Sequence, residues 1–138
     1  MQGKIFLDTN IFVYTQSKDD TNKRDIALKA IKNYECYTST QVLNEVSNVM
    51  IKKLKMPICE VKQVIFAINK CCDITNVTYE TVQKALDLKE KYGYSYYDSL
   101  ILSAAILIEC DYVCSEDLHD GQILDYGIEI VNIFNQNL

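Results

Sequence analysis

The chain alternates short apolar segments with longer segments of helical periodicity, and this alternation most constrains its fold. Apolar runs at residues 4–7 and 112–114 stop at polar residues, as buried strands do at their ends. Apolar residues recur at three- and four-residue steps in five further segments, residues 21–34, 40–55, 57–68, 78–92 and 95–108. We therefore expect an α/β fold, a three-layer sandwich whose central, mostly parallel sheet is flanked by helices.

Capping residues mark several of the helix ends. Ser39 or Thr40 begins the helix that continues to about residue 55, and Thr78 begins a later helix. Gly93 suits the left-handed residue that follows a helix. Ser95, with Asp98 three residues later, resembles a capping box in which Asp replaces the usual Glu. Further strands are expected at residues 35–38, at 73–77 as a sheet edge, and at 128–131.

Length and composition favour one domain that spans residues 1–138. The chain has one proline and four glycines, which leaves little material for a flexible linker. Hydrophobic residues make up 49% and charged residues 24%, which excludes a disordered chain. The net charge of −5 argues against a general nucleic-acid coat protein, because such a protein carries a basic face.

The N-terminus and the cysteines indicate a cytoplasmic protein. The first apolar run has three residues and ends at Asp8, so it is no signal peptide, and the stretch Leu100–Ile108 is shorter than the roughly 20 residues of a membrane span. The six cysteines are expected as reduced thiols that pack as small hydrophobes in the core. The spacing of Cys110, Cys114 and His119 argues against a zinc site.

Four acids lie beside apolar elements, where a charge normally has a reason. Asp8 ends the first strand, Asp117 follows a later strand, Asp98 lies in the first turn of the most apolar helix, and Glu45 lies within the helix of residues 40–55. Each has a structural alternative: Asp98 complements a helix dipole, Glu45 lies on a solvated face, and Asp117 forms a turn. Asp8 is hardest to explain this way, because ligands bind beyond the carboxyl ends of parallel strands.

Together these acids belong to a recognisable pattern. Phe6-Leu-Asp-Thr-Asn10, Asn44-Glu-Val46, Tyr94-Ser-Tyr-Tyr-Asp-Ser-Leu-Ile101 and Ser115-Glu-Asp-Leu-His-Asp-Gly121 occur in one order along the chain. This order and spacing resemble those of the PIN-domain nucleases, and most closely the bacterial VapC-type toxin ribonucleases. The resemblance implies an endoribonuclease that hydrolyses RNA phosphodiester bonds through a water activated by Mg²⁺ or Mn²⁺. It implies that Asp8, Glu45, Asp98 and Asp117 are the catalytic, metal-binding acids.

The same resemblance assigns supporting residues. Asn10 and Ser115 match supporting polar positions, and Asp120 matches a further acid. Whether Asp120 or Glu116 contacts the metal stays open, although the motif position favours Asp117 over Glu116 as the inward carboxylate. Candidates for substrate binding are Tyr96, Tyr97, Lys52 and Lys53; the tyrosines could equally pack at a helix entrance, and the lysines could complement a helix dipole.

The resemblance also implies partners. It indicates the toxin of a type II toxin–antitoxin pair, with an RNA substrate, a cognate antitoxin protein and a homodimer. The alternatives are an RNA-processing PIN nuclease outside such a pair and a non-catalytic PIN-like binding module. A phosphotransferase with a strand-end aspartate is disfavoured, because Asn10 stands where such enzymes carry a second Asp. Assigning four of the 19 acids to one site leaves a nearly neutral remainder, so the acidity does not exclude RNA.

Overall fold

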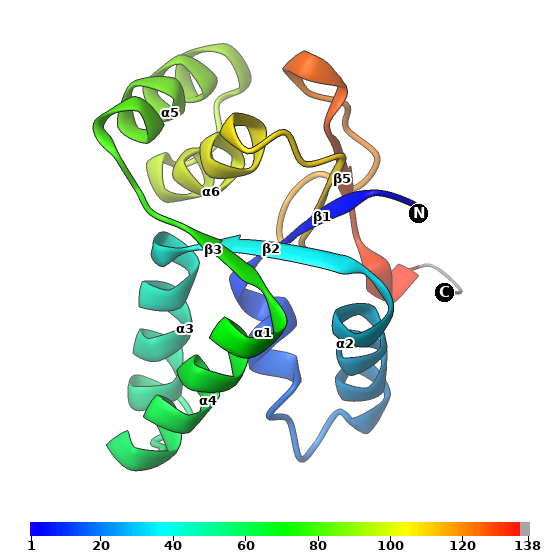
Figure 1. Ribbon diagram of the computed structural model, residues 1–138, viewed down its shortest axis with the longest axis vertical. Coiled ribbons are helices and arrows are strands. Elements are labelled where there is room, and N and C mark those ends of the chain that lie inside the picture. Colours follow the sequence, from blue (N-terminus) through cyan, green and yellow to red (C-terminus); the bar gives the residue numbers. More distant parts are fainter. Residues whose placement is uncertain (136–138) are drawn as a thin grey trace.

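A parallel sheet with helices on both faces forms the framework of the protein. The computed structural model describes residues 1–135. The sheet contains five strands in the order β3-β2-β1-β4-β5, and the four pairings between neighbouring strands are all parallel. Figure 1 shows α5 and α6 on one face of the sheet and α1, α2 and α4 on the other. The predicted three-layer α/β sandwich is confirmed.

The elements follow one another in nearly the predicted alternation. The strands are β1 (Lys4–Leu7), β2 (Glu35–Ser39), β3 (Asp73–Thr75), β4 (Tyr112–Cys114) and β5 (Glu129–Val131). The α-helices are α1 (Thr9–Tyr14), α2 (Thr21–Asn33), α3 (Thr40–Lys52), α4 (Ile58–Cys71), α5 (Tyr79–Tyr92) and α6 (Tyr96–Leu107). Two short 3₁₀ turns, η1 (Asp125–Gly127) and η2 (Ile133–Asn135), flank β5.

The central position of β1 explains why three of its four residues are apolar. Its last three residues, Ile5, Phe6 and Leu7, are completely buried, because helices cover both faces of the sheet. Ile5 pairs with Cys36 of β2 on one side and with Tyr112 of β4 on the other. After Leu7 the chain reaches the carboxyl edge of the sheet, where polar residues resume at Asp8.

The strand order reverses next to β1, and this reversal positions the candidate site. The chain passes from β1 to β2 and β3 on one side, then returns to place β4 and β5 on the other side. The carboxyl ends of β1 and β4 therefore adjoin, and the backbone N–H of Asp8 donates to the carbonyl of Cys114 at 3.0 Å. Ligands of open α/β sheets bind in the crevice at such a reversal.

Most of the predicted caps are present, with one correction. The Ser39 hydroxyl accepts a hydrogen bond from the N–H of Val42, and Gly93 is left-handed with φ of 77°. Ser95 accepts from the N–H of Asp98, but the structure has no reciprocal bond from the Asp98 carboxylate. The reciprocal capping box lies instead at Thr78, with Thr81 as its partner. The Asp98 carboxylate is therefore left to face the cleft described below.

The prediction for the cysteines is wrong for two of the six. All six are free thiols, and Cys36, Cys72, Cys110 and Cys114 are buried as expected. Cys59 and Cys71, however, are exposed. Both lie on α4, an outer helix whose buried residues are Val61 and Ile68, so much of its surface remains in contact with solvent.

No helix within residues 1–135 is long and apolar enough to cross a membrane. The most apolar helix, α6, packs into the protein interior instead. Its residues from Ser99 to Ile106 are all buried.

Candidate active site

Four acids from separate parts of the chain line one cleft at the carboxyl edge of the sheet. Asp8 follows β1, Glu45 lies on α3, Asp98 lies in the first turn of α6, and Asp117 follows β4. The cleft has a volume of about 460 Å³. The sequence-predicted catalytic acids are therefore neighbours in space as well as members of one motif pattern.

Asp8 is the most deeply buried of the four acids, with 5% of its surface exposed. Its carboxylate caps α1 by accepting the N–H of Thr9 at 2.6 Å and also accepts the Ser115 hydroxyl at 2.7 Å. Burial raises the pKa of Asp8 above its ordinary value. The two hydrogen bonds oppose that rise, while the carboxylates of Asp98 and Asp117 add to it.

Glu45 faces this buried charge from α3. Partial burial and then the charge of Asp8 raise the pKa of Glu45 to about 7, with a smaller contribution from Asp98. The Gln41 side chain, one turn earlier, donates to its carboxylate at 3.4 Å and lowers the pKa slightly. The mutual influence of these carboxylates shows that they share one electrostatic environment. A bound cation would relieve their repulsion.

The loop after β4 separates the roles of two adjacent acids. Asp117 lines the cleft, and its N–H donates to the Ser115 hydroxyl at 3.2 Å. The Glu116 carboxylate instead accepts the Tyr14 hydroxyl at 2.7 Å and pairs with the Lys23 ammonium at 2.5 Å. The structure thus directs Glu116 into an ion pair with α2 and leaves Asp117 at the cleft.

Of the predicted supporting residues, Asn10 lines the cleft and Asp120 does not. The Asn10 side-chain carbonyl accepts the N–H of Glu116 at 3.5 Å, whereas its amide nitrogen is buried without a partner among the described residues. The Thr9 hydroxyl is also buried without a partner there, and both residues line the cleft. Asp120 is exposed, does not line the cleft, and accepts the N–H of Asn132 at 2.9 Å. Its contact stabilises the loop that leads into and out of β5.

Only one of the four candidates for substrate binding lines the cleft. Lys53 lines the cleft, while its neighbour Lys52 does not. Tyr96 and Tyr97 lie outside the cleft lining, with ring centroids 5.6 Å apart, and Tyr97 is 59% exposed.

Sequence reasoning missed half of the residues that line the cleft. These residues are Thr9, Val13, Tyr14, Asn48, Val49 and Leu54. Asn48 could have been found, because it lies three residues after Glu45 on the same helical face. The apolar members carry no sequence signal that distinguishes them from core residues.

The donor chemistry of the cleft fits a hard divalent cation. Within residues 1–135, no three His, Cys, Asp or Glu side chains converge closely enough to hold one ion. Mg²⁺, however, commonly binds one or two carboxylates directly and keeps several of its waters. Four carboxylates around a cleft of this size suit that mode of binding. Cys110 and Cys114, by contrast, are buried thiols beside and within β4.

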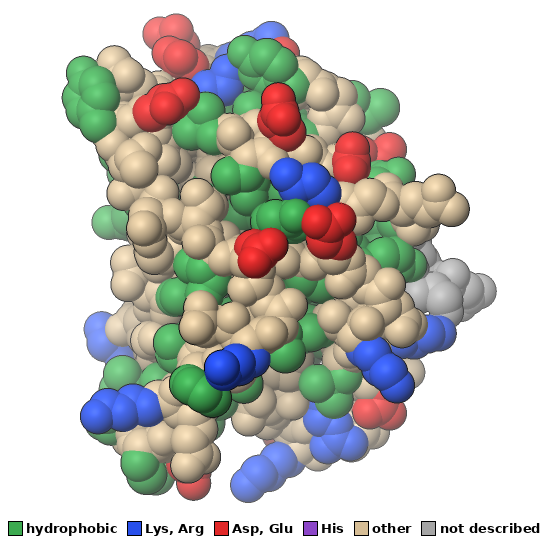
Figure 2. All heavy atoms as spheres, viewed as in Figure 1, with side chains coloured by type: hydrophobic (Ala, Val, Ile, Leu, Met, Phe, Trp, Pro, Cys, Tyr) green, Lys and Arg blue, Asp and Glu red, His purple; other side chains and the backbone are tan. Residues whose placement is uncertain are grey.

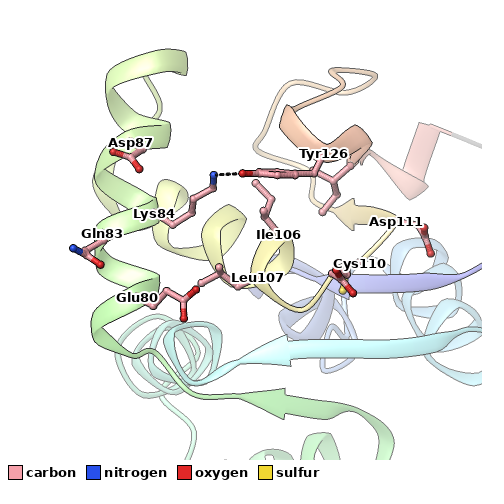
Figure 3. Close-up of a pocket in the computed structure, with 11 residues that line it drawn as sticks. Glu80, Gln83, Lys84, Asp87, Ile106, Leu107, Cys110, Asp111 and Tyr126 are labelled. Carbon is pink, nitrogen blue, oxygen red and sulfur yellow. Dashed lines mark hydrogen bonds between the residues drawn. The ribbon is translucent and has the colours of Figure 1, made fainter.

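A second and larger hollow lies at the opposite, amino edge of the sheet. Figure 3 shows its wall of α5 and the turn before β4, with Tyr126 reaching across toward Lys84. The Lys84 ammonium donates to the Tyr126 hydroxyl at 3.3 Å. The volume is about 780 Å³, and four acids are among the lining residues, namely Glu80, Asp87, Glu109 and Asp111. None of the predicted site residues lies there.

The family assignment rests on a match over most of the chain. The family model for the PIN domain matches residues 5–119. The chain belongs to the PIN-domain family. The matched region of this PIN domain contains all four acids of the cleft. No curated protein matches the chain.

Solved structures share the fold of this PIN domain at low sequence identity. VapC20 of Mycobacterium tuberculosis, described as a sarcin-ricin loop cleaving toxin, is 15% identical with a TM-score of 0.68, over 82% of this chain and 91% of that chain. A toxin–antitoxin complex from Klebsiella pneumoniae is 21% identical with a TM-score of 0.66, over 90% and 94%. VapBC2 from Rickettsia felis, bound to a DNA fragment from their promoter, is 20% identical with a TM-score of 0.65, over 92% and 98%.

Proposed function

We propose that this protein is an Mg²⁺- or Mn²⁺-dependent endoribonuclease that hydrolyses RNA phosphodiester bonds. The observation that carries the proposal is the gathering of Asp8, Glu45, Asp98 and Asp117 around one cleft of a PIN domain, at the reversal of strand order. The raised pKa values of Asp8 and Glu45 support it, because perturbed acids in a cleft are typical of functional sites.

The acids have distinct parts in this proposal. A divalent cation, when bound, lowers the pKa of a coordinated water and offsets negative charge on the phosphate. Asp8, Asp98 and Asp117 would hold the cation directly or nearly so, and Glu45 would bind it directly, bind it through water, or orient the attacking water. Ser115 fixes the Asp8 carboxylate through its 2.7 Å hydrogen bond.

Asn10 and Thr9 would contact the substrate or its water. Each has a buried polar atom without a partner among residues 1–135, and such an atom is costly unless a ligand satisfies it. The Asn10 amide donates to acceptors, and phosphate oxygens are acceptors. Asp120 has a loop contact instead, so we assign it no part in the chemistry.

We further propose that the enzyme is the toxin of a type II toxin–antitoxin pair. The fold resembles structures described as a toxin, a toxin–antitoxin complex and a VapBC assembly, which supports a cognate antitoxin protein as partner. A homodimer and a cytoplasmic location belong to the same proposal. An RNA-processing enzyme outside such a pair, and a non-catalytic binding module, are the alternatives.

One experiment tests the catalytic proposal. Purified protein is incubated with mixed RNAs in Mg²⁺, in Mn²⁺ and in EDTA, beside the Asp8→Asn variant. We expect cleavage in the presence of metal and no cleavage with EDTA or with the variant. Equal cleavage with and without EDTA would overturn the proposed mechanism. RNA binding without cleavage in any metal would favour the binding module.

The toxin assignment needs a separate test in cells. Expression of the chain should arrest growth, while the Asp98→Asn variant should not. Co-expression of the protein encoded next to it should restore growth. RNA cleavage in vitro without growth arrest would favour the RNA-processing alternative.

A further inference from the structure

The lining of the cleft changes in chemistry along α3, because Lys53 follows Glu45 by eight residues and lies about 12 Å farther along the helix axis. Besides the four acids, the lining includes Lys53 and the apolar residues Val13, Val49 and Leu54, and we call these four residues the second end of the cleft. Val13 comes from α1, whereas the other three come from the last turn of α3 and the residues just after it. None of these four side chains is a carboxylate, so their chemistry calls for an explanation other than metal binding.

The backbone fixes Lys53 and Leu54 at this end of the cleft. The N–H groups of both residues donate to the Val49 carbonyl, at 2.9 and 3.2 Å, which closes the end of α3. The chain then reverses at Lys55, whose φ of 50° is in the left-handed region, and Met56 donates back to the Met50 carbonyl at 3.0 Å. These contacts hold the turn in place, although Lys53, Leu54 and Lys55 are solvent-exposed.

Lys53 is the only cation among the described residues that line the cleft, and it forms no salt bridge within residues 1–135. Leu54, beside it, is 45% exposed, so an apolar surface is available next to an unneutralised positive charge. A nucleotide matches this combination, because the flat faces of its base can pack against apolar side chains and its phosphate is anionic.

The charge of the surrounding surface favours the same ligand. Lys84, Lys89 and Lys91 are the only lysines or arginines after position 72, and the segment from α2 to α4, residues 21–71, contains nine of the 14 in the chain. Figure 2 shows a corresponding but partial separation, with most acidic side chains of this face in the upper half and most basic ones in the lower half, including over α4. A polyanion would therefore approach the cleft from the side of α3.

We propose that Val13, Val49, Lys53 and Leu54 form a nucleotide subsite for the RNA residue that flanks the cleaved bond. The base packs against the apolar side chains, and Lys53 pairs with a phosphate next to the scissile one. This inference rests on the proposed ribonuclease function and adds the substrate position to it. Lys53 is then a substrate-binding residue with no part in holding the metal.

Binding of a labelled RNA tests the subsite separately from cleavage. The probe is a fluorescein-labelled, 12-nucleotide single-stranded RNA of mixed sequence, titrated by anisotropy in Mg²⁺ against protein carrying Asp98→Asn to prevent cleavage. Adding Lys53→Ala should raise Kd about fourfold at 0.15 M salt and reduce the salt slope by about 0.7, the effect of one lost phosphate contact to a single strand. Lys53→Arg should restore both values.

Matched control variants distinguish the loss of a subsite contact from the loss of any positive charge or of any exposed apolar side chain. Lys52→Ala removes a neighbouring exposed lysine outside the cleft and should change Kd less than twofold. Leu54→Ala should raise Kd about threefold, as expected for one lost apolar contact. Leu86→Ala, at a 54% exposed position on α5, should leave Kd unchanged.

Catalysis provides a second readout. In protein that retains Asp98, Lys53→Ala should raise KM about fourfold while kcat stays within twofold, because the lost contact is made before the reaction as well as during it. Unchanged metal affinity in the same variant would confirm that Lys53 does not support the carboxylates.

Three outcomes would overturn the subsite. The first is an unchanged RNA affinity in Lys53→Ala, and the second is an equal loss in Lys52→Ala. The third is a Leu54→Ala variant with unchanged RNA affinity but an altered oligomeric state by light scattering, which would make the apolar residues a protein contact. If the wild-type protein binds but never cleaves RNA, the ribonuclease proposal fails while the binding titrations still decide the subsite.

Discussion

The two hollows of this protein contain similar numbers of acids but differ in how those acids are arranged. At the carboxyl edge of the sheet, four acids from four parts of the chain line a cleft of about 460 Å³. At the amino edge, four acids line a hollow of about 780 Å³. Each lining also includes one lysine, Lys53 in the cleft and Lys84 in the larger hollow, so neither volume nor charge count identifies the active site.

Burial of an acid and buried polar atoms without partners distinguish the cleft at the carboxyl edge from the larger hollow. Asp8 is almost completely buried and has a raised pKa, and two neighbouring side chains have buried polar atoms without partners in the described structure. In the larger hollow, the Asp111 carboxylate accepts the N–H of Lys4 at 2.8 Å, and Tyr126 is 80% exposed. Acids in water cost little and need no ligand, whereas buried repelling acids favour a cation.

The largest expected effect is on catalysis. Asp98→Asn should reduce RNA cleavage by about a thousandfold or more, because it removes a carboxylate charge from the proposed metal site. Asp87→Asn, in the other hollow, should leave the rate within twofold. The measurement is the initial rate of cleavage in Mg²⁺, with circular dichroism to verify folding. A folded Asp98→Asn variant with full activity would remove this residue from the site.

Metal binding should stabilise the protein through the cleft alone. At a Mn²⁺ concentration about ten times Kd, the midpoint of thermal unfolding should rise by about 5 °C, since binding to the native state adds about 1.4 kcal/mol. Asp8→Asn should abolish this rise, and Glu80→Gln, at the other hollow, should preserve it. Differential scanning calorimetry with and without EDTA provides the measurement. An equal rise in Asp8→Asn would place the ion elsewhere.

The raised pKa of Glu45 predicts how stability depends on pH in the absence of metal. Below about pH 4.5, Glu45 is protonated in both states; as pH rises toward 7, the unfolded state loses its proton first, and the folded state is destabilised. The expected loss between pH 5 and pH 8 is about 1–2 kcal/mol from this group, after allowance for its partial exposure.

Urea unfolding in EDTA at the two pH values measures this loss. Glu45→Gln should reduce the decline, because the amide does not ionise. The raised pKa of Asp8 acts in the same direction, so part of the decline should remain in that variant. A wild-type protein that is equally stable at both pH values would contradict the electrostatic account of the cleft.

The smallest expected effects concern contacts at the rims of the two hollows. Glu116→Gln should lower the free energy of unfolding by about 1 kcal/mol, because the Glu116 carboxylate pairs with Lys23 and accepts the Tyr14 hydroxyl at a partly buried position. Lys84→Ala should change it by about 0.5 kcal/mol at most, since the contact with Tyr126 is exposed. Chemical denaturation of both variants makes the comparison, and a reversed order would refute it.

Local signals account for what could be predicted about the fold. The buried run of β1, the caps Ser39 and Thr78, and Gly93 at the end of α5 act within a few residues, so the sequence displays them directly. The wrong prediction for two cysteines arose because no local signal reports their exposure. Cys59 and Cys71 have no local feature that distinguishes them from buried cysteines, and their exposure follows from the outer position of α4.

The candidate site shows the same limit. The motif order identifies Asp8, Glu45, Asp98 and Asp117 and favours Asp117 over Glu116 as the inward carboxylate, but it cannot distinguish Lys53 from Lys52. The tertiary structure separates both pairs, because Glu116 meets Lys23 of α2 and only Lys53 reaches the cleft. It also gives Asp120 a contact with the backbone of Asn132, away from the other acids.

The sequence by itself therefore determined the alternation of strands and helices and the identity of four unusual acids. Periodicity, capping and motif spacing are properties of the sequence, so they can be recognised without knowledge of the packing. Only the tertiary structure decided which side chains share the cleft, which point away from it, and which apolar residues form its second end. Those outcomes depend on how α1, α3, α6 and the loop after β4 meet at the reversal of strand order, where the contacts join residues far apart in the chain.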